Sequence, residues 1–207
     1  MKSFSFSALL FTFIVLSLPF ADQAKADYFV WEDEKSGVSL SYPDTWHLTS
    51  NQKSGDIFTI NGPNDFQDRP TCRLNVREDG RFEIYPPEHY RSIQKISYSQ
   101  NYWETEVKKN YRDANVLQFG DNAGLGRAFG SYIIVDYTDY KGQKPKDMRA
   151  IATAGYFAGD AYLFECKAER DGFDKWRPLF QSIQASIEFQ PVFSPLPHGF
   201  YRNFVHN

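Results

Sequence analysis

The sequence has few of the residues that cross-link a small secreted fold or hold a metal ion. It contains two cysteines, four histidines and two methionines among 207 residues. Two cysteines exclude a disulfide-dense scaffold, so a hydrophobic core has to provide most of the stability. The length suits one domain, and a domain of this size buries about 70% of the surface that its unfolded chain exposes.

Neither sign of charge is in large excess. The chain has 23 Lys and Arg against 26 Asp and Glu, and its formal net charge is −3 at pH 7. Proteins that bind nucleic acid or anionic membranes usually carry a basic excess. The composition therefore predicts neither of these partners.

Specific catalytic and metal-binding motifs are missing. The histidines, including His47 and His89, lack the short spacing of zinc ligands. Gly124-Leu125-Gly126-Arg127 has no third glycine and precedes a strand, so we interpret it as a turn. Glu32-Asp33-Glu34 lacks the spacing of a calcium loop and is interpreted as a solvated loop. We predict no catalytic residue, no metal site and no cofactor.

Long apolar runs are absent except at the N-terminus. Lys2 precedes an apolar run over residues 8–20, and Ala24-Lys25-Ala26 has the small-x-small form that signal peptidase cuts. The run is shorter than the ~20 residues that span a membrane. We predict that residues 1–26 are a cleaved signal peptide. The mature chain would then be periplasmic or secreted, with no membrane-spanning segment.

The two cysteines, Cys72 and Cys166, lie in strand-like segments. Each shares an apolar face with an alternate neighbour, Leu74 for Cys72 and Phe164 for Cys166, so both sulfurs should point into a core. Export and an even count favour a disulfide between them. Two buried thiols that never meet are the alternative, because bridging needs Cα atoms within about 7 Å.

Aromatic residues are abundant, with 19 Phe, 13 Tyr and 4 Trp. Many alternate within strand-like runs, so we interpret them as core residues of a sheet; a ring-lined binding surface is the alternative. A separate group lies in the proline-rich C-terminal segment, residues 190–207. Its residue types are common in binding hot spots, and its members either contact a partner or fold back onto the domain: Phe200, Tyr201, Arg202 and Phe204.

Strand patterns fill much of the chain. Short runs at residues 38–42, 57–60 and 72–77 end in turn signals, which is typical of antiparallel sheets. Tyr132 to Val135 is apolar on both faces and predicts a central strand with a layer on each side. Two further runs, residues 150–157 and 161–168, flank a tight turn and predict a hairpin.

Two segments have a helical period. The first stripe contains Ile93, Trp103 and Val107 and weakens over residues 97–100, which leaves open one helix or two shorter ones. The second stripe comprises Phe173, Trp176, Phe180 and Ile183. We expect this last helix to begin near Asp174, with the Asp174 side chain as its N-cap.

Both ends of the chain carry a family resemblance. Gly37-Val38-Ser39-Leu40-Ser41-Tyr42-Pro43-Asp44-Thr45-Trp46 resembles the opening of PsbP-like domains, in which a strand ends in Tyr-Pro and a Trp follows. The last predicted helix, followed by Ser186-Ile187-Glu188-Phe189, is similar to the close of that family. The resemblance implies an α+β fold over residues 27–189, a three-layer α/β/α sandwich around a central antiparallel sheet.

The resemblance also implies a role in binding and assembly without catalysis. We therefore predict an exported, non-enzymatic bacterial module that contacts a protein partner in the cell envelope. The aromatic excess keeps a periplasmic small-molecule or lipid carrier as the alternative. A hydrolase whose polar residues converge only in three dimensions is less favoured.

Overall fold

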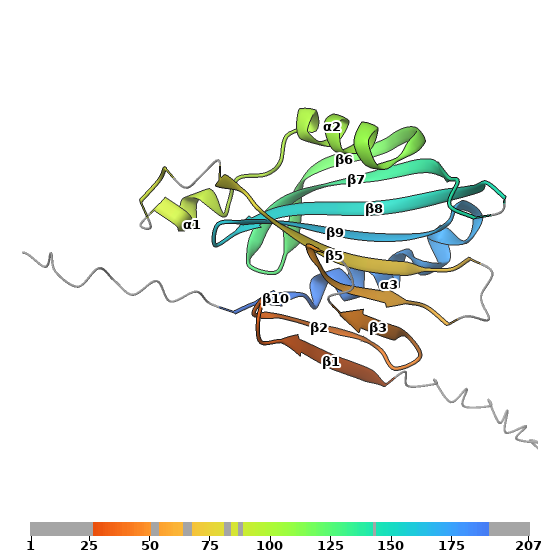
Figure 1. The fold of residues 1–207 in the computed structure, drawn as a ribbon, viewed down its shortest axis with the longest axis horizontal. Coiled ribbons are helices and arrows are strands. Elements are labelled where there is room, and N and C mark those ends of the chain that lie inside the picture. The colour runs from red at the N-terminus through yellow and green to blue at the C-terminus, as the bar shows by residue number, and fades with distance from the viewer. Residues whose placement is uncertain are drawn as a thin grey trace, which may run out of the picture.

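A computed structural model describes residues 27–50, 54–63, 68–80, 84–86, 89–142 and 144–190 (Figure 1). The expected leader and the candidate contacts Phe200, Tyr201, Arg202 and Phe204 lie outside these ranges. The elements in chain order are β1 (Tyr28–Asp33), β2 (Val38–Pro43), β3 (His47–Ser50), β4 (Asp56–Asn61), β5 (Thr71–Glu78), α1 (Tyr90–Ile93), α2 (Gln100–Asn110), β6 (Arg112–Leu125), β7 (Ala128–Asp139), β8 (Lys146–Phe157), β9 (Asp160–Glu169), a 3-10 turn (Arg170–Gly172), α3 (Phe173–Ala185) and β10 (Glu188–Phe189).

Seven strands form the main sheet, in the order β3-β4-β5-β9-β8-β7-β6, with every neighbouring pair antiparallel. Most neighbours are also consecutive in the chain, as expected for strands joined by hairpins. The exception is the pairing of β5 with β9, which joins two distant segments. A second sheet of three strands has the order β1-β2-β10.

The two longer helices lie on opposite faces of the main sheet, which confirms the expected layered α+β fold (Figure 1). On one face Trp103 and Val107 of α2 pack with Ile133. On the other, Phe180 of α3 packs in the same cluster as Leu40 of β2. The small sheet therefore shares the layer of α3.

The central strand β7 shows why both layers are needed. Ile133 and Val135 belong to the cluster under α2, whereas Ile134 belongs to the cluster under α3. A strand with apolar residues on both faces is stable only where both faces are covered. The prediction of a two-faced central strand at Tyr132 to Val135 is confirmed.

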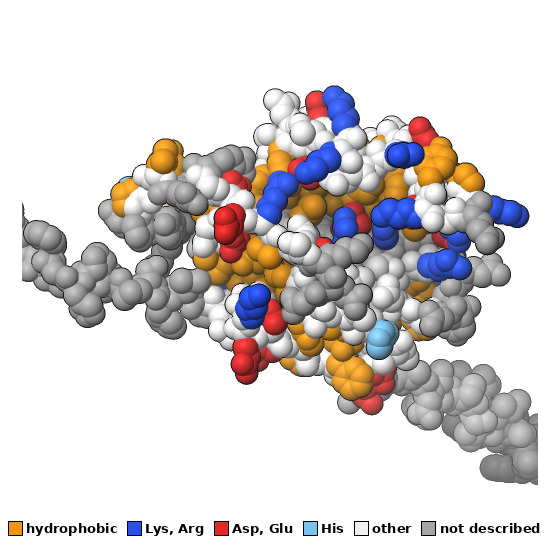
Figure 2. Space-filling model, viewed as in Figure 1, with side chains coloured by type: hydrophobic (Ala, Val, Ile, Leu, Met, Phe, Trp, Pro, Cys, Tyr) orange, Lys and Arg blue, Asp and Glu red, His pale blue; other side chains and the backbone are white. Residues whose placement is uncertain are grey.

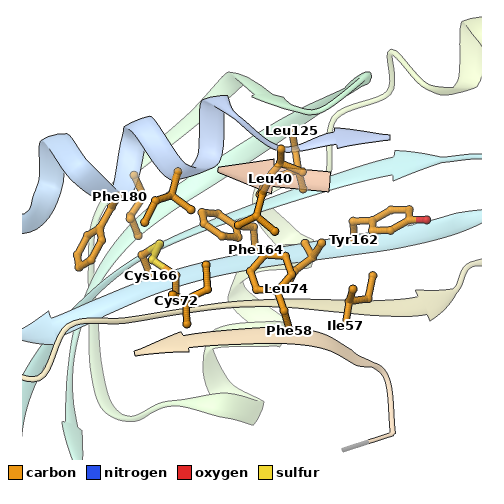
Figure 3. Packing of buried hydrophobic residues seen from close by; sticks show 14 of the residues in the cluster. Leu40, Ile57, Phe58, Cys72, Leu74, Leu125, Tyr162, Phe164, Cys166 and Phe180 are labelled. Carbon is orange, nitrogen blue, oxygen red and sulfur yellow. A yellow bond between two sulfur atoms is a disulfide. The ribbon is translucent and has the colours of Figure 1, made fainter. Parts of the chain in front are cut away.

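The larger core lies between the main sheet, α3 and β2 (Figure 3). Phe58 of β4 and Phe164 of β9 are buried there with ring centroids 6.5 Å apart. At its edge Trp46 meets Trp176 in an edge-on contact of 5.7 Å. These rings fill the core, as their alternation predicted, whereas Phe29, Phe129 and Tyr140 are exposed.

Helix α2 is anchored to the sheet by a buried polar relay. The Trp103 indole donates to the Ser131 hydroxyl at 2.8 Å, and Ser131 donates to the Tyr98 carbonyl at 2.6 Å. The Ser99 hydroxyl caps the helix by accepting from the Tyr102 amide. Because α2 begins only at Gln100, the weak stretch over residues 97–100 separates two helices, one of the two predicted alternatives.

Two local expectations were wrong. Helix α3 begins at Phe173, with Gly172 as an N-cap that makes no side-chain hydrogen bond, so Asp174 is already inside the first turn. In this position its carboxylate is stabilised by the positive end of the helix dipole. Glu32 and Asp33 end β1, where they pair with β2, and only Glu34 lies in the expected exposed turn. The Asp33 carboxylate closes this turn by accepting hydrogen bonds from the Ser36 amide and hydroxyl.

The long edge strand β6 was not predicted. Most of its residues are exposed, and its pairing with β7 shifts register at three places. Asp113 adopts a positive φ of 51° within one of these irregular stretches. Irregular edge strands of this kind lack the regular alternation of apolar and polar residues by which a strand is recognised in a sequence. They also discourage pairing with other chains.

Cys72 and Cys166 form a disulfide with Cα atoms 4.0 Å apart. The two residues are directly opposed in the β5–β9 ladder and are fully buried in the core under α3. Their separation of 94 residues means that the bond closes a long loop of the unfolded chain. Closing such a loop removes conformational entropy from the unfolded state.

Replacing both Cys72 and Cys166 by alanine should lower the free energy of unfolding by about 2–5 kcal/mol. Urea unfolding of the oxidised wild type and of the double variant measures this difference. A reductant should shift the wild-type midpoint toward that of the double variant and leave the variant unchanged. Equal midpoints for the two proteins without reductant would contradict the prediction.

Stability should also fall at alkaline pH through Tyr162. Burial, with the charge of Asp160 as a second cause, raises the pKa of Tyr162 to about 12, against about 10 in an unfolded chain. The unfolded state therefore releases this proton first, so the contribution is complete below pH ~10 and disappears as the pH rises toward about 12. Melting temperatures between these pH values should fall less steeply for Tyr162→Phe, whereas Tyr28→Phe, which changes an exposed ring, should keep the wild-type slope.

Candidate binding face and pocket

Helix α2 covers only part of its side of the main sheet. It packs over β6, β7, β8 and the start of β9, and Arg77 near the end of β5 bonds to it. The described residues leave the other half of this face open, from Lys167 of β9 across β5 and β4 to β3 (Figure 1). We call this half the open face. Its outward side chains are mostly polar and half-buried: Thr49, Thr59, Asn61, Thr71, Arg73, Asn75, Arg77 and Lys167.

Two cross-strand rows order the open face. Each row consists of directly opposed residues, Thr49–Thr59–Arg73–Glu165 in one and His47–Asn61–Thr71–Lys167 in the next. Within the second row the Thr71 hydroxyl donates to the Asn61 side-chain carbonyl at 3.3 Å. Because opposed side chains in a sheet lie only about 5 Å apart, the rows make a rigid polar surface.

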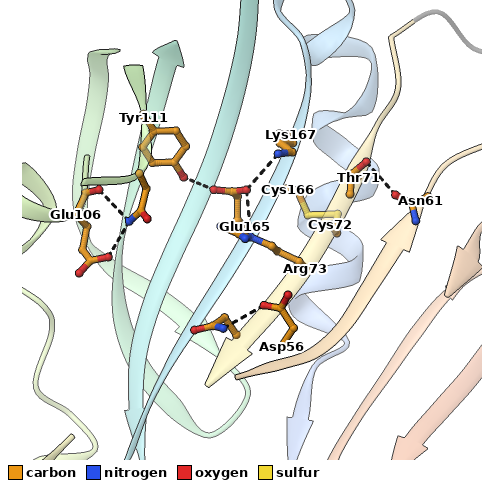
Figure 4. Close-up of polar contacts among 12 residues, drawn as sticks. Asp56, Asn61, Thr71, Cys72, Arg73, Glu106, Tyr111, Glu165, Cys166 and Lys167 are labelled. Carbon is orange, nitrogen blue, oxygen red and sulfur yellow. Dashed lines mark hydrogen bonds and ion pairs between the residues drawn. A yellow bond between two sulfur atoms is a disulfide. The ribbon is translucent and has the colours of Figure 1, made fainter. Parts of the chain in front are cut away.

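The first row ends in a buried carboxylate, Glu165, which is 2% exposed (Figure 4). Arg73 Nε lies 3.4 Å and Lys167 Nζ 3.9 Å from Glu165 Oε1. The Tyr111 hydroxyl donates to Oε2 from the junction of α2 and β6. A buried charge needs such partners because its loss of hydration is costly.

Two members of the network, Arg73 and Tyr111, have pKa values raised by their surroundings. The charge of Glu165 raises the pKa of Arg73. Burial, followed by the charge and hydrogen bond of Glu165, holds the pKa of Tyr111 well above its usual value. Arg73 therefore stays cationic and Tyr111 stays a hydrogen-bond donor at physiological pH.

A pocket of about 300 Å³ opens beside this network, at the C-terminal end of α2. We call it the cationic pocket, because four cationic side chains line it against the two carboxylates of Glu165 and Asp139. The cations are Arg73, Arg112, Lys141 and Lys167. Figure 2 shows Lys and Arg side chains gathered on this side of the molecule, below the C-terminal end of α2.

Tyr137 lines the cationic pocket with an unpartnered hydroxyl. The residue is 8% exposed, and its ring centroid lies 4.8 Å from that of Tyr111. Burial, and then the charge of Glu165, raises the pKa of Tyr137. The pocket wall thus contains a protonated phenol whose hydrogen-bonding capacity is unused, which is uncommon for a buried polar group.

The disulfide lies directly behind the charged network. Cys72 precedes Arg73 in β5, and Cys166 separates Glu165 from Lys167 in β9, with the sulfurs on the opposite face of the sheet (Figure 4). The bond therefore fixes the register of the two strands that bring Arg73 to Glu165.

The histidines considered in the sequence do not converge on this site. His47 is exposed at the start of β3, and His89 is exposed just before α1. Neither lines the cationic pocket. His198 and His206 lie outside the described residues.

The residues of the network were missed by the sequence analysis. Strand alternation puts Glu165 on the face opposite Cys166, but nothing near Glu165 in the sequence indicates burial. Its cover, Tyr111, comes from a segment 54 residues away. An acidic residue in the middle of an otherwise apolar strand was the one available signal.

Within the part of the chain that the structure describes, no group of three or more His, Cys, Asp or Glu residues is placed to hold a metal ion. In the same residues, no helix has both the length and the apolar character needed to cross a membrane.

The fold is similar to that of cyanobacterial PsbP from Synechocystis sp., with 15% identity, 81% of this chain and 95% of that chain covered, and a TM-score of 0.48. LpqN, a protein involved in cell envelope biogenesis of Mycobacterium tuberculosis, is similar with 15% identity, coverage of 81% and 92%, and a TM-score of 0.43. A variant of the protein Mog1 matches at 8% identity, coverage of 79% and 96%, and a TM-score of 0.48.

No family model matches the sequence, and a search of curated proteins finds no match.

Two neighbouring tyrosines should respond differently to loss of their hydroxyl groups. Tyr111→Phe removes a donor from the buried Glu165 carboxylate and should lower the free energy of unfolding by about 1–3 kcal/mol. Tyr137→Phe removes a hydroxyl without a partner and should leave stability within about 0.5 kcal/mol of wild type. Urea unfolding of both variants measures the difference, and equal losses would show that the network does not depend on Tyr111.

Proposed function

We propose that this protein is an exported, non-enzymatic binding module that presents the open face to a protein partner in the cell envelope. The single observation that carries the proposal is the open face itself. One half of the sheet face is covered by α2, whereas the other half displays ordered rows of Thr, Asn, Arg and Lys side chains.

The composition of the open face suits a protein contact. Arg73 and Arg77 have side chains 37% and 43% exposed, and both are anchored by carboxylates, Glu165 and Glu106. An arginine that is already held in place loses less conformational freedom when a partner binds. Arginine is also among the residues enriched at binding hot spots.

Export is supported by two independent features. The N-terminal segment has the form of a signal peptide, and the disulfide between Cys72 and Cys166 is of the kind that persists in oxidising compartments. On this proposal the mature chain begins at Asp27.

Two alternatives receive less support from the geometry. A lipid carrier needs an enclosed apolar cavity, but the space of about 450 Å³ between α3 and β6 to β8 mixes apolar residues such as Ile151 with the polar side chains of Arg177 and Gln184. A hydrolase built on His47 or His89 would need these residues in a pocket, and both are exposed.

Site-specific photo-cross-linking in the native host tests the proposed function. A photoreactive residue at Thr59, in the middle of the open face, should give one defined protein adduct. The mass of the cross-linked chain should correspond to a sequence that begins at Asp27. The same residue at Ser182, exposed on α3, is the matched control and should give none. Repeating the Thr59 experiment in a chain that ends at Gln190 shows whether the adduct depends on the C-terminal segment.

Three outcomes would overturn the proposal. The adduct could form at Ser182 but not at Thr59, or disappear in the chain that ends at Gln190 because the partner contacts the C-terminal segment instead. A substrate-dependent activity abolished by one polar substitution would show that the protein is an enzyme.

A further inference from the structure

The cationic pocket has an excess of positive charge. Its four cationic side chains face two carboxylates, which leaves two positive charges unbalanced. The C-terminal end of α2 offsets these by roughly half an elementary charge, since helix C-termini are partially negative. A dianion would come close to neutralising the pocket.

Both carboxylates in the pocket are already engaged. Glu165 accepts from Tyr111 on one oxygen and pairs with Arg73 and Lys167 on the other. Asp139 accepts from the Lys141 backbone amide at 2.9 Å. Their partners reduce the repulsion that an entering anion would otherwise meet.

Several donors remain available to such an anion. Arg73 contacts Glu165 through Nε, which leaves the two terminal nitrogens of its guanidinium for a second oxyanion. Lys141 is exposed at the rim of the pocket. Lys167 lines the same space, with a side chain that is 26% exposed.

The size of the pocket and the residues in its walls indicate a ligand larger than a bare ion. Its volume of about 300 Å³ is at the lower end of the range of roughly 300–1,000 Å³ for small-molecule sites. Three phenol rings, Tyr111, Tyr137 and Tyr140, line it together with the cations. A small organic body attached to a doubly charged group satisfies both features.

We propose that the cationic pocket binds a phosphate monoester, with Arg73, Lys141 and Lys167 as its donors. A monoester concentrates two negative charges on three terminal oxygens, which matches donors that converge on one space. The monoester is either a free metabolite or the headgroup of a lipid. This inference goes beyond the proposed function, because it requires no protein partner.

Calorimetric titration of the protein with phenyl phosphate at pH 8 tests the inference, since the monoester is a dianion there. Saturable binding is expected, with dimethyl phosphate, which carries a single charge, binding much more weakly. Succinate is a dianion whose charges are separated, and it should also bind weakly. Vesicles containing phosphatidic acid distinguish a lipid headgroup from a free monoester.

Two variants locate the binding in the pocket. Lys167→Ala should weaken phenyl phosphate binding by about two- to five-fold, because it removes a partly exposed cation from the pocket. Lys141→Ala should weaken it by about two- to five-fold, as for an exposed ion pair. Lys95→Ala removes an exposed lysine near α1 and should leave the affinity unchanged.

Absence of saturable binding to both phenyl phosphate and the vesicles would overturn the inference. So would equal affinity for succinate, or affinity that is unchanged in both Lys167→Ala and Lys141→Ala. Binding to vesicles alone, lost in both variants, would support the pocket and assign the monoester to a lipid. Cross-linking at Thr59 is independent of these results, so the two proposals fail separately.

Discussion

The pairing of β5 with β9 is the interaction on which the rest of the structure depends. It joins the N-terminal strands β3 to β5 to the C-terminal meander β6 to β9, and no other ladder of the described main sheet does so. The disulfide between Cys72 and Cys166 fixes its register. The same two strands bring Arg73 to Glu165 on the opposite face. Stability and the candidate site therefore rest on one pair of strands.

A carboxylate in the middle of a sheet imposes a second constraint. Glu165 is buried because Tyr111 and the end of α2 cover it, and its charge is compensated by partners from β5 and β9. The network thus ties the covered half of the sheet face to the open half. A polar network that is fully paired can orient its members for binding, since each side chain has one favoured position.

Much of the fold was predictable from the sequence, because it depends on local periodicity. The two-faced strand at Tyr132 to Val135 and the stripe of Trp176, Phe180 and Ile183 both lie where their patterns placed them. The incorrect predictions concern segments whose structure does not follow a regular hydrophobic period. Asp33 ends a strand and closes the next turn, but its acidic neighbours give the segment the composition of a loop. Register shifts in β6 conceal a strand of 14 residues.

The sequence by itself determined the layered class of the fold, the inward direction of Cys72 and Cys166, and the face on which Glu165 lies, because each follows from the two-residue period of a strand. Only the tertiary structure decided that the two cysteines meet, that Glu165 is buried, and that Tyr137 and Lys141 border the same pocket. These facts depend on which distant segments become neighbours, and pairing between distant segments is set by the packing of the whole domain.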